Sequence, residues 1–160
     1  FPDMRVPATN LLGEENAGFT YLTTNLAAER LSIACNSQAA AVSALGWTIE
    51  ALADGKPSQD IKFALADCAA SVAAGQALID QAIQQMIDGR LTPADAAAAK
   101  LYCTELQGRV VRACLDAMPP GAVYRAGSKV GQAFLDGRVS RIYGGSSEIM
   151  KVILAQQMGL

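Results

Sequence analysis

Helix start and stop signals divide the chain after residue 19 into a few long segments. These signals constrain the fold more than any other feature of the sequence. The first segment, from about Thr20 to Ala53, stops at Gly55-Lys56-Pro57. Glycine is common just past a helix end and proline cannot continue a helix, so we expect the first long helix to end there. Ser58 predicts the cap of a second helix, which ends near Gly89.

The third helix carries two independent start signals in the stretch TPAD. Thr92 and Asp95 form a capping-box pattern, and Pro93 stands at the first helical position. This helix is expected to run to about Ala117, where MPPG, residues 118 to 121, ends it. Proline and glycine together rule out a continuous helix through that stretch.

Two shorter helices complete the predicted fold. One is expected over residues 128 to 136, and the last starts at Ser146 or Ser147 and runs to about Gln157. Alanine-rich runs such as AAAVSAL and ADAAAAK allow helix axes to approach closely. The sequence therefore predicts an all-α fold, an antiparallel up-and-down four-helix bundle with a short extra helix, in which the last helix is the fourth member. Residues 1–19, rich in Pro, Asn and Gly, predict an extended N-terminal tail.

Composition and charge exclude several classes of function. The chain has 160 residues, of which 51% are hydrophobic, and this suits one domain with a real core. Its net charge of -2 provides no basic footprint for nucleic acid. Charged or polar residues interrupt every apolar run before the roughly 20 residues that a bilayer requires, so no membrane span is expected. With no signal peptide visible, we predict a cytoplasmic protein.

Histidine is absent, and the four cysteines are far apart in the sequence. The absence of histidine removes Ser-His and Cys-His nucleophile pairs and most zinc sites, so no metal site is expected. Cys35, Cys68, Cys103 and Cys114 form no CxxC motif and are interpreted as reduced, buried, small apolar residues. A reactive thiol is the alternative.

One carboxylate falls on an apolar helical stripe. Leu22, Leu26, Glu29 and Ile33 follow at spacings of 4, 3 and 4, which places them on one face of a helix. Because burying an ionised carboxylate alone is very costly, Glu29 must be solvated through a cleft, paired, or kept for chemistry. The pairing alternative is a structural ion pair with an arginine of a neighbouring helix, Arg109 or Arg112.

Three stretches together resemble the C-terminal helical domain of the acyl-CoA dehydrogenases. VPATNLLGEENAGF, residues 6 to 19, is similar to the family's V-P-x-x-N-x-L-G-x-x-x-x-G-F, and AAERLSIA spans residues 27 to 34. LDGRVSRIYGGSSEIMKVILAQQ, residues 135 to 157, resembles the signature R-D-x-R-V-x-x-I-Y-x-G-T-x-E-I. The resemblance implies that residues 1–19 end the middle β-domain and its linker, that residues 20–160 form the bundle, and that the chain is a fragment.

The resemblance also implies a reaction. Family enzymes desaturate an acyl-CoA thioester: a glutamate removes the α-proton, FAD takes the β-hydride, and an electron-transfer flavoprotein receives the electrons. Most members carry the glutamate in a Y-E-G-T loop, which here reads Tyr143-Gly144-Gly145-Ser146. The long-chain and isovaleryl-CoA types carry it on the long helix before an arginine, as Glu29-Arg30 does here. We therefore expect Glu29 as the catalytic base and Arg30, Gly144 and Gly145 as substrate-binding residues.

The start of the last helix has two interpretations. The family resemblance implies that Ser146, Ser147 and Glu148 bind FAD, and free backbone N–H groups at a helix N-terminus do favour polar or anionic ligands. The alternative is a simple turn with an N-cap, in which Glu148 complements the helix dipole.

Two stretches depart from the family pattern for holding the partner subunit's flavin. The family's R-x-x-F-G is replaced by residues 51–55, ALADG, and its Q-x-x-G-G by Asp116-Ala117-Met118-Pro119-Pro120. Two prolines remove the backbone donors that two glycines would supply. Heteromeric acyl-CoA dehydrogenases, with one flavin for each pair of unlike subunits, offer one explanation, so a homo- or hetero-oligomer is expected. The alternative is a flavin-poor or non-catalytic partner subunit of such an enzyme.

Overall fold

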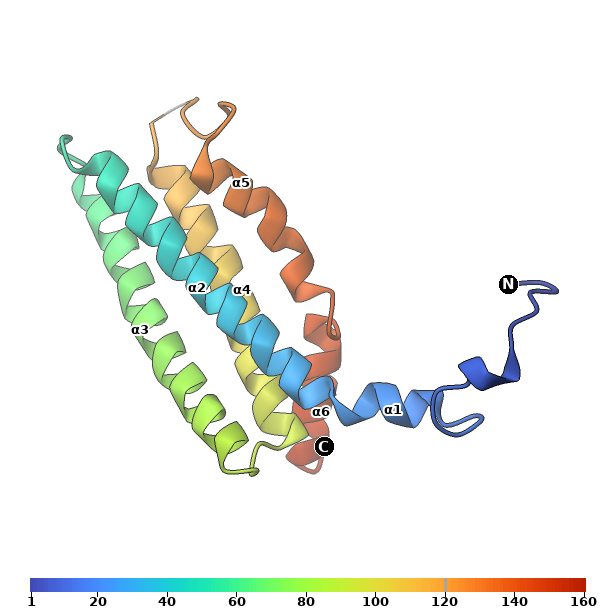
Figure 1. Cartoon of the computed structure of the whole chain (residues 1–160). Helices are drawn as coiled ribbons and strands as arrows, with labels where there is room; N and C mark the ends of the chain where they lie inside the picture. Colours follow the sequence, from blue (N-terminus) through green and yellow to red (C-terminus); the bar gives the residue numbers. More distant parts are fainter. Residues whose placement is uncertain (120) are drawn as a thin grey trace.

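The computed structural model describes residues 1–119 and 121–160, and all of the regular structure in this part of the chain is helical (Figure 1). The tail carries a short 3-10 helix, η1, over Ala8–Asn10, and then α1, Gly18–Thr24. The elements of the bundle follow in chain order: α2 over Leu26–Leu52, α3 over Gln59–Ile87, α4 over Pro93–Ala117, α5 over Lys129–Asp136, the 3-10 helix η2 over Gly137–Arg141, and α6 over Ser147–Gln157.

The bundle has the predicted up-and-down topology, with α4 at its centre. Successive members run in opposite directions, and α4 contacts α2, α3, α5, η2 and α6 (Figure 1). The fourth position differs from the prediction, because α5, η2 and α6 share it along the length of α4. The 11 residues of α6 span only about 16 Å, whereas the 25 residues of α4 span about 38 Å. The last helix alone is therefore too short to be the fourth member.

The first long helix is broken, contrary to the continuous helix predicted from Thr20 to Ala53. Asn25, at φ -101° and ψ 0°, separates α1 from α2. The hydroxyls of Thr23 and Thr24 both donate to the Thr20 carbonyl oxygen, at 3.0 and 2.8 Å. Such side-chain bonds compete with the backbone hydrogen bonds of a helix, which gives a local reason for the break.

Small side chains bring α2 and α4 together. Six alanines on these two helices are completely buried: Ala34, Ala41, Ala44, Ala96, Ala97 and Ala99. Larger core residues, among them Leu45, Leu106 and Val110, fill the space on either side. Close packing of this kind makes the pair of helices a rigid support for the groups at their ends.

The predicted caps and cysteines are mostly as expected. Asp95 N donates to Thr92 Oγ1 at 3.1 Å and Thr92 N donates to Asp95 Oδ2 at 3.2 Å, which confirms the capping box. Ser58 stands at the N-cap position of α3 but makes no side-chain cap bond. Its hydroxyl instead bonds Asp60, and this lowers the pKa of that carboxyl. All four cysteines are free; Cys35 is half-buried and the other three are buried.

Several large apolar side chains of α3 are exposed. They are Phe63 near the start of the helix and Ile83, Met86 and Ile87 in its last turns. By length and composition alone, α3 would be able to cross a bilayer, which the sequence analysis did not anticipate, and only 17% of its most apolar window is buried. One such helix is weak evidence for a membrane span, and α3 packs against α2 and α4 in the bundle.

Candidate functional site

Two glycines with left-handed backbone conformations form the turn before α6. Gly144 has φ +65° and Gly145 has φ +104°, a region that side-chain-bearing residues rarely adopt. Arg30 Nε, on α2, donates to the Gly144 carbonyl oxygen at 3.1 Å. Lys100 Nζ, on α4, donates to the Gly145 carbonyl oxygen at 2.7 Å. The turn is thus held by one cation from each of the two central helices.

Both cations are buried. Arg30 is 8% exposed and Lys100 is not exposed at all. Burial, followed by the positive charge of Arg30, lowers the pKa of Lys100, while Glu105 and Glu148 act in the opposite direction. Charge-assisted hydrogen bonds of this kind are stronger than neutral ones, so the position of the turn is well determined. Arg30, expected to bind substrate, has its guanidinium engaged with the turn.

Lys100 was missed by the sequence analysis, although a signal was available. It stands in the run ADAAAAKLYC, directly after four alanines, Ala96 to Ala99. A lysine among residues that predict a close helix contact must either extend out of the contact or find acceptors inside it. Lys100 does the second, because it reaches the carbonyl of the glycine turn.

Glu29 lies beside the same turn. A Cβ atom added to Gly144 would be 3.8 Å from Glu29 Oε1, and it would overlap Ile33 Cδ1. Glu29 is in the first turn of α2, one residue before the arginine that holds Gly144. The fold therefore brings together the helix carboxylate and the glycine turn that the sequence analysis singled out.

The surroundings of Glu29 differ from the predicted apolar stripe. Leu22 lies on α1, beyond the break, and is 73% exposed, Leu26 is half-buried, and Glu29 itself is exposed. Only Ile33 of the four residues is buried. The helix break at Asn25 removes Leu22 from the stripe, whereas Leu26 and Glu29 are on the same helix as Ile33 but nearer its open end. The carboxylate is solvated on a side of the bundle that these 160 residues leave open.

Arg112 does not form the ion pair with Glu29 that the sequence analysis considered as an alternative. Arg112 Nε pairs with Asp116 Oδ2 at 3.0 Å on its own helix. Within residues 1–119 and 121–160, Glu29 takes part in no ion pair, with Arg109 or any other residue. Of the three options for this carboxylate, structural pairing loses its support.

The hydroxyls at the start of α6 are engaged within the protein. Ser146 accepts from Ile149 N at 3.5 Å as the N-cap of α6, and its hydroxyl bonds Glu148, which lowers the pKa of that exposed carboxyl. The buried Ser147 donates to Glu105 Oε1 at 2.6 Å. The cap interpretation thus holds for the side chains. Since Arg30 and Lys100 engage the two glycine carbonyl oxygens, the exposed Glu148 carboxylate and the backbone N–H groups of the turn are the groups left for a ligand.

Glu105, which the sequence analysis did not select, joins three elements. Its Oε1 accepts from Ser147 on α6, and its Oε2 pairs with Arg141 Nη1 of η2 at 3.4 Å. These contacts fix both ends of the segment that contains Gly144 and Gly145. The turn is therefore anchored to α4 on both sides as well as through Lys100.

The stretches that depart from the family pattern lie at the far end of the bundle. The helix α2 ends at Leu52, and residues 51–55 contain no arginine. Asp116 is an anion, and its ion pair with Arg112 engages the cation closest to it. Pro120 lies outside the described residues. These side chains do not fit the phosphate end of a dianionic cofactor.

Comparison with known proteins identifies the class to which this helical domain belongs. The family profile "Acyl-CoA dehydrogenase, C-terminal domain" matches residues 16–159. The chain therefore belongs to the acyl-CoA dehydrogenase family and corresponds to its C-terminal domain, an assignment that confirms the resemblance in the sequence.

Individual relatives agree with this assignment. The mitochondrial long-chain specific acyl-CoA dehydrogenase of Rattus norvegicus is 36% identical over 169 residues, which cover 99% of this chain and 38% of that protein. A subunit of the caffeyl-CoA reductase-Etf complex of Acetobacterium woodii is 29% identical over 96% of this chain and 42% of the subunit. The crystal structure of acyl-CoA dehydrogenase from Geobacillus kaustophilus has a TM-score of 0.94 at 33% identity and covers 100% of this chain and 44% of its own. The chain thus spans about two fifths of the length of these relatives.

Proposed function

We propose that the protein containing this chain desaturates an acyl-CoA thioester between its α and β carbons, with Glu29 as the base. The observation that carries the proposal is the proximity of the Glu29 carboxylate to the Gly144 turn. The relatives named above include a long-chain specific acyl-CoA dehydrogenase. A glutamate on the helix beside a turn that lacks one is consistent with that relationship.

In this reaction, a carboxylate oxygen of Glu29 takes the α-proton. Its exposure on the open side of the bundle gives a substrate access, and its place on α2 gives it a rigid support. Arg30 and Lys100 position the turn beside it, and the backbone of Gly144 and Gly145 is the proposed substrate contact. FAD, when bound, supplies the acceptor for the β-hydride.

The residues of this chain fit a flavin beside Glu29 but not the flavin of a partner subunit at the far end of the bundle. Near Glu29, the two glycines leave backbone accessible without side chains, and Glu148 is exposed beside them. At the far end, Asp116 is paired and residues 51–55 lack an arginine. We therefore propose that FAD is held mainly by other parts of the protein and by a partner subunit.

The proposed partners follow from the family and from one surface. An electron-transfer flavoprotein is proposed to receive the electrons, since one relative is a subunit of a reductase-Etf complex. The exposed apolar side chains of α3 support a homo- or hetero-oligomer. The domain boundary after residue 19, the status of the chain as an inactive fragment, and the cytoplasmic location stay predictions of the sequence.

The variant Glu29→Gln in the full-length protein tests the role of the base. Anaerobic titration with a series of acyl-CoA substrates is expected to bleach the flavin absorbance of the wild type and to leave that of the variant unchanged, at equal flavin content. The matched control is Glu50→Gln, the same substitution on an exposed glutamate of α2, about 32 Å along the helix. Bleaching at the wild-type rate in Glu29→Gln would show that another group is the base.

The alternative function is a flavin-poor or non-catalytic partner subunit, favoured by the paired Asp116 and by residues 51–55. The flavin content of the full-length protein distinguishes the two, measured after purification alone and after co-expression with a related subunit. Flavin that appears only with the partner, together with bleaching that depends on Glu29, supports a shared catalytic site. Flavin that appears with the partner but bleaches normally in Glu29→Gln supports the non-catalytic role.

A further inference from the structure

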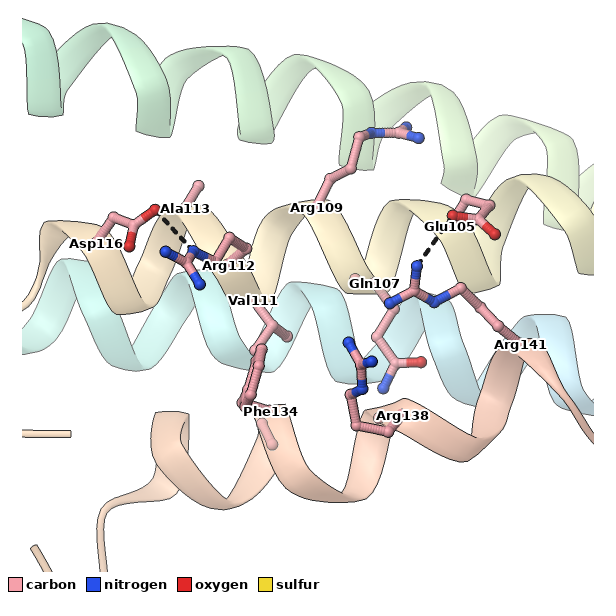
Figure 2. A pocket seen from close by; sticks show the side chains of 13 residues that line it. Glu105, Gln107, Arg109, Val111, Arg112, Ala113, Asp116, Phe134, Arg138 and Arg141 are labelled. Atoms are coloured by element: carbon pink, nitrogen blue, oxygen red, sulfur yellow. Dashed lines mark hydrogen bonds and ion pairs between the residues drawn. The ribbon is translucent and has the colours of Figure 1, made fainter. Parts of the chain in front are cut away.

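We propose that a second site, in a cavity between α4 and the α5–η2 segment, binds a small organic phosphate. The cavity has a volume of about 520 Å³ and lies on the face of α4 that carries residues 105, 109, 112 and 116 (Figure 2). It is independent of Glu29 and does not rest on the proposed dehydrogenase activity. We call it the arginine cavity.

Charge is the first argument. Six ionisable side chains line the arginine cavity: Arg109, Arg112, Arg138, Arg141, Glu105 and Asp116. Four arginines against two carboxylates leave an excess of positive charge, on a chain whose net charge is -2. Of the two arginines outside the ion pairs, Arg109 points toward α3 and Arg138 lies on the α5–η2 side of α4 (Figure 2). A phosphomonoester is an anion at neutral pH and would be attracted to this excess. Arginine's fixed fork of N–H groups suits phosphate oxygens.

The arrangement of the ion pairs places the free charge in the middle. The Arg112–Asp116 pair, at 3.0 Å, lies toward one end of the cavity and the Arg141–Glu105 pair, at 3.4 Å, toward the other (Figure 2). Arg138 lies between them (Figure 2). Its guanidinium is 5.8 Å from the centre of the Phe134 ring, and it has no carboxylate partner among the described residues. A phosphate group between the two pairs would meet this cation.

Gln107 provides an independent observation that points to a ligand. Its side chain is 7% exposed, lines the cavity and lies beside Arg138 (Figure 2). Its buried Oε1 has no hydrogen-bond partner in the part of the chain that the structure describes. A buried acceptor left unpaired costs free energy, and a ligand hydroxyl or N–H would satisfy it.

Two glycines make room for these polar groups. A Cβ atom on Gly137 would be 2.9 Å from Gln107 Nε2, and one on Gly108 would be 3.0 Å from Arg141 Nη2. Any side chain at these positions would displace Gln107 or Arg141. The polar lining of the cavity therefore depends on glycine at both places.

The remaining wall is apolar, which favours an organic phosphate over a bare ion. Val111, Ala113, Ala133 and Phe134 line it beside the charged groups. A volume of about 520 Å³ is within the usual range of small-molecule sites, and it leaves space for a group attached to the phosphate. A sugar would place hydroxyls within reach of Gln107 and its carbon atoms against this wall.

Calorimetric titration of the full-length protein, saturated with FAD so that the flavin site is occupied, tests the proposal. The probes are inorganic phosphate, ribose 5-phosphate and AMP, each in 0.15 M NaCl. We expect saturable binding of one site per chain. Arg138→Gln, which removes an exposed side chain and leaves both ion pairs in place, is expected to weaken binding at least tenfold. Gln107→Leu is expected to weaken the binding of the two sugar phosphates more than the binding of inorganic phosphate.

The control is Arg90→Gln, an exposed arginine that is paired with Asp88 outside the cavity. Its affinity is expected to stay within twofold of the wild type. Tighter binding of AMP or ribose 5-phosphate supports an organic phosphate, whereas preference for inorganic phosphate would overturn that part of the proposal. Absence of binding to all three probes, or equal weakening by Arg138→Gln and Arg90→Gln, would overturn the site itself.

Discussion

The Glu29 carboxylate on α2 and the α-carbon of Gly144 in the turn before α6 face the same space, since a Cβ on Gly144 would lie 3.8 Å from Glu29 Oε1. The sequence resemblance implies that most family members carry their base in this turn and some carry it on the long helix. Because positions 29 and 144 are adjacent in space, a glutamate at either position would place its carboxylate in the same part of the site. This adjacency supports Glu29 as the base of this protein.

The first prediction concerns moving the base to the turn. In the double variant Glu29→Gln/Gly144→Glu, we expect only a small part of the wild-type flavin bleaching rate to return. Residue 144 has φ +65°, which costs a non-glycine residue about 1–2 kcal/mol, and its new Cβ would overlap Ile33 Cδ1. Adding Ile33→Val, which removes that methyl group, is expected to raise the rate.

The control for this series is Glu29→Gln/Ile33→Val, which has the space but no carboxylate and is expected to be inactive. Stopped-flow absorbance measures the bleaching rate at saturating acyl-CoA. If a folded, flavin-containing triple variant is no faster than this control, the two positions are not equivalent for proton transfer.

The second prediction concerns the pH dependence of stability due to Lys100. Burial and Arg30 lower the pKa of Lys100 below its ordinary value of 10.5. Between the lowered native pKa and 10.5, the unfolded chain binds more protons at this site than the native protein, so the contribution of Lys100 to the free energy of unfolding rises with pH. The difference in unfolding free energy between wild type and Lys100→Met should therefore rise across this window and be flat below it.

Urea unfolding at a series of pH values measures this difference. Lys62→Met, which removes an exposed lysine from α3, controls for the loss of one charge. A wild-type advantage that decreases as the pH rises would contradict the lowered pKa of Lys100.

The third prediction is that the buried thiols resist modification. Burial raises the pKa of Cys103 to about 12 and also raises those of Cys68 and Cys114. At pH 8, a thiol with that pKa is ionised in only about one molecule in ten thousand, and the thiolate is the reactive form. We expect these three cysteines to react with Ellman's reagent only on unfolding.

The same shift has a consequence for stability. Because the native pKa of Cys103 lies above its unfolded value of 9.0, its contribution to stability is present below pH 9 and is lost as the pH rises toward 12. Cys103→Ala should remove that part of the pH dependence. Rapid labelling of Cys103 in the native protein at pH 8 would contradict both expectations.

The fourth prediction compares two glycines inside long helices. A Cβ on Gly75 of α3 would overlap Gln38 Oε1 and lie 2.9 Å from Leu106 Cδ2, whereas one on Gly46 of α2 would meet nothing within 4 Å. Gly46→Ala is expected to stabilise by about 0.5–1 kcal/mol through helix propensity. Gly75→Ala is expected to destabilise by about 1–2 kcal/mol, since overpacking outweighs the same gain.

Urea unfolding followed by circular dichroism measures both variants, and each serves as the other's control for helix propensity. Equal stabilisation by the two alanines would mean that α3 moves away from α2 at no cost. Gln38 Nε2 donates to the Val72 carbonyl oxygen of α3 at 2.7 Å, and this bond would be lost by such a movement.

The sequence by itself determined most helix boundaries, the up-and-down topology and the family, but not the break at Asn25 or the composition of the fourth bundle position. The capping box of Thr92 and Asp95, the start of α5 after Ser128 and the end of α4 at Ala117 are where the pattern predicts them. Caps and breaks are interactions between residues at most a few positions apart, so they can be read directly from the order of residue types. Glu29 and the glycine turn were also selected as a pair from residue types and family resemblance.

Only the tertiary structure decided how these groups meet. The burial of Lys100 against Gly145, the contacts of Glu105 and the arginine cavity all depend on residues from different elements. The residues joined by the hydrogen bonds of Lys100, Gln38 and Glu105 are 34 or more positions apart in the sequence. Such contacts depend on the rotation and spacing of packed helices, which the side-chain period of one helix does not specify. The exposure of Glu29 likewise depends on which side of α2 the other helices leave open, and the break at Asn25 moves only Leu22 off the predicted stripe.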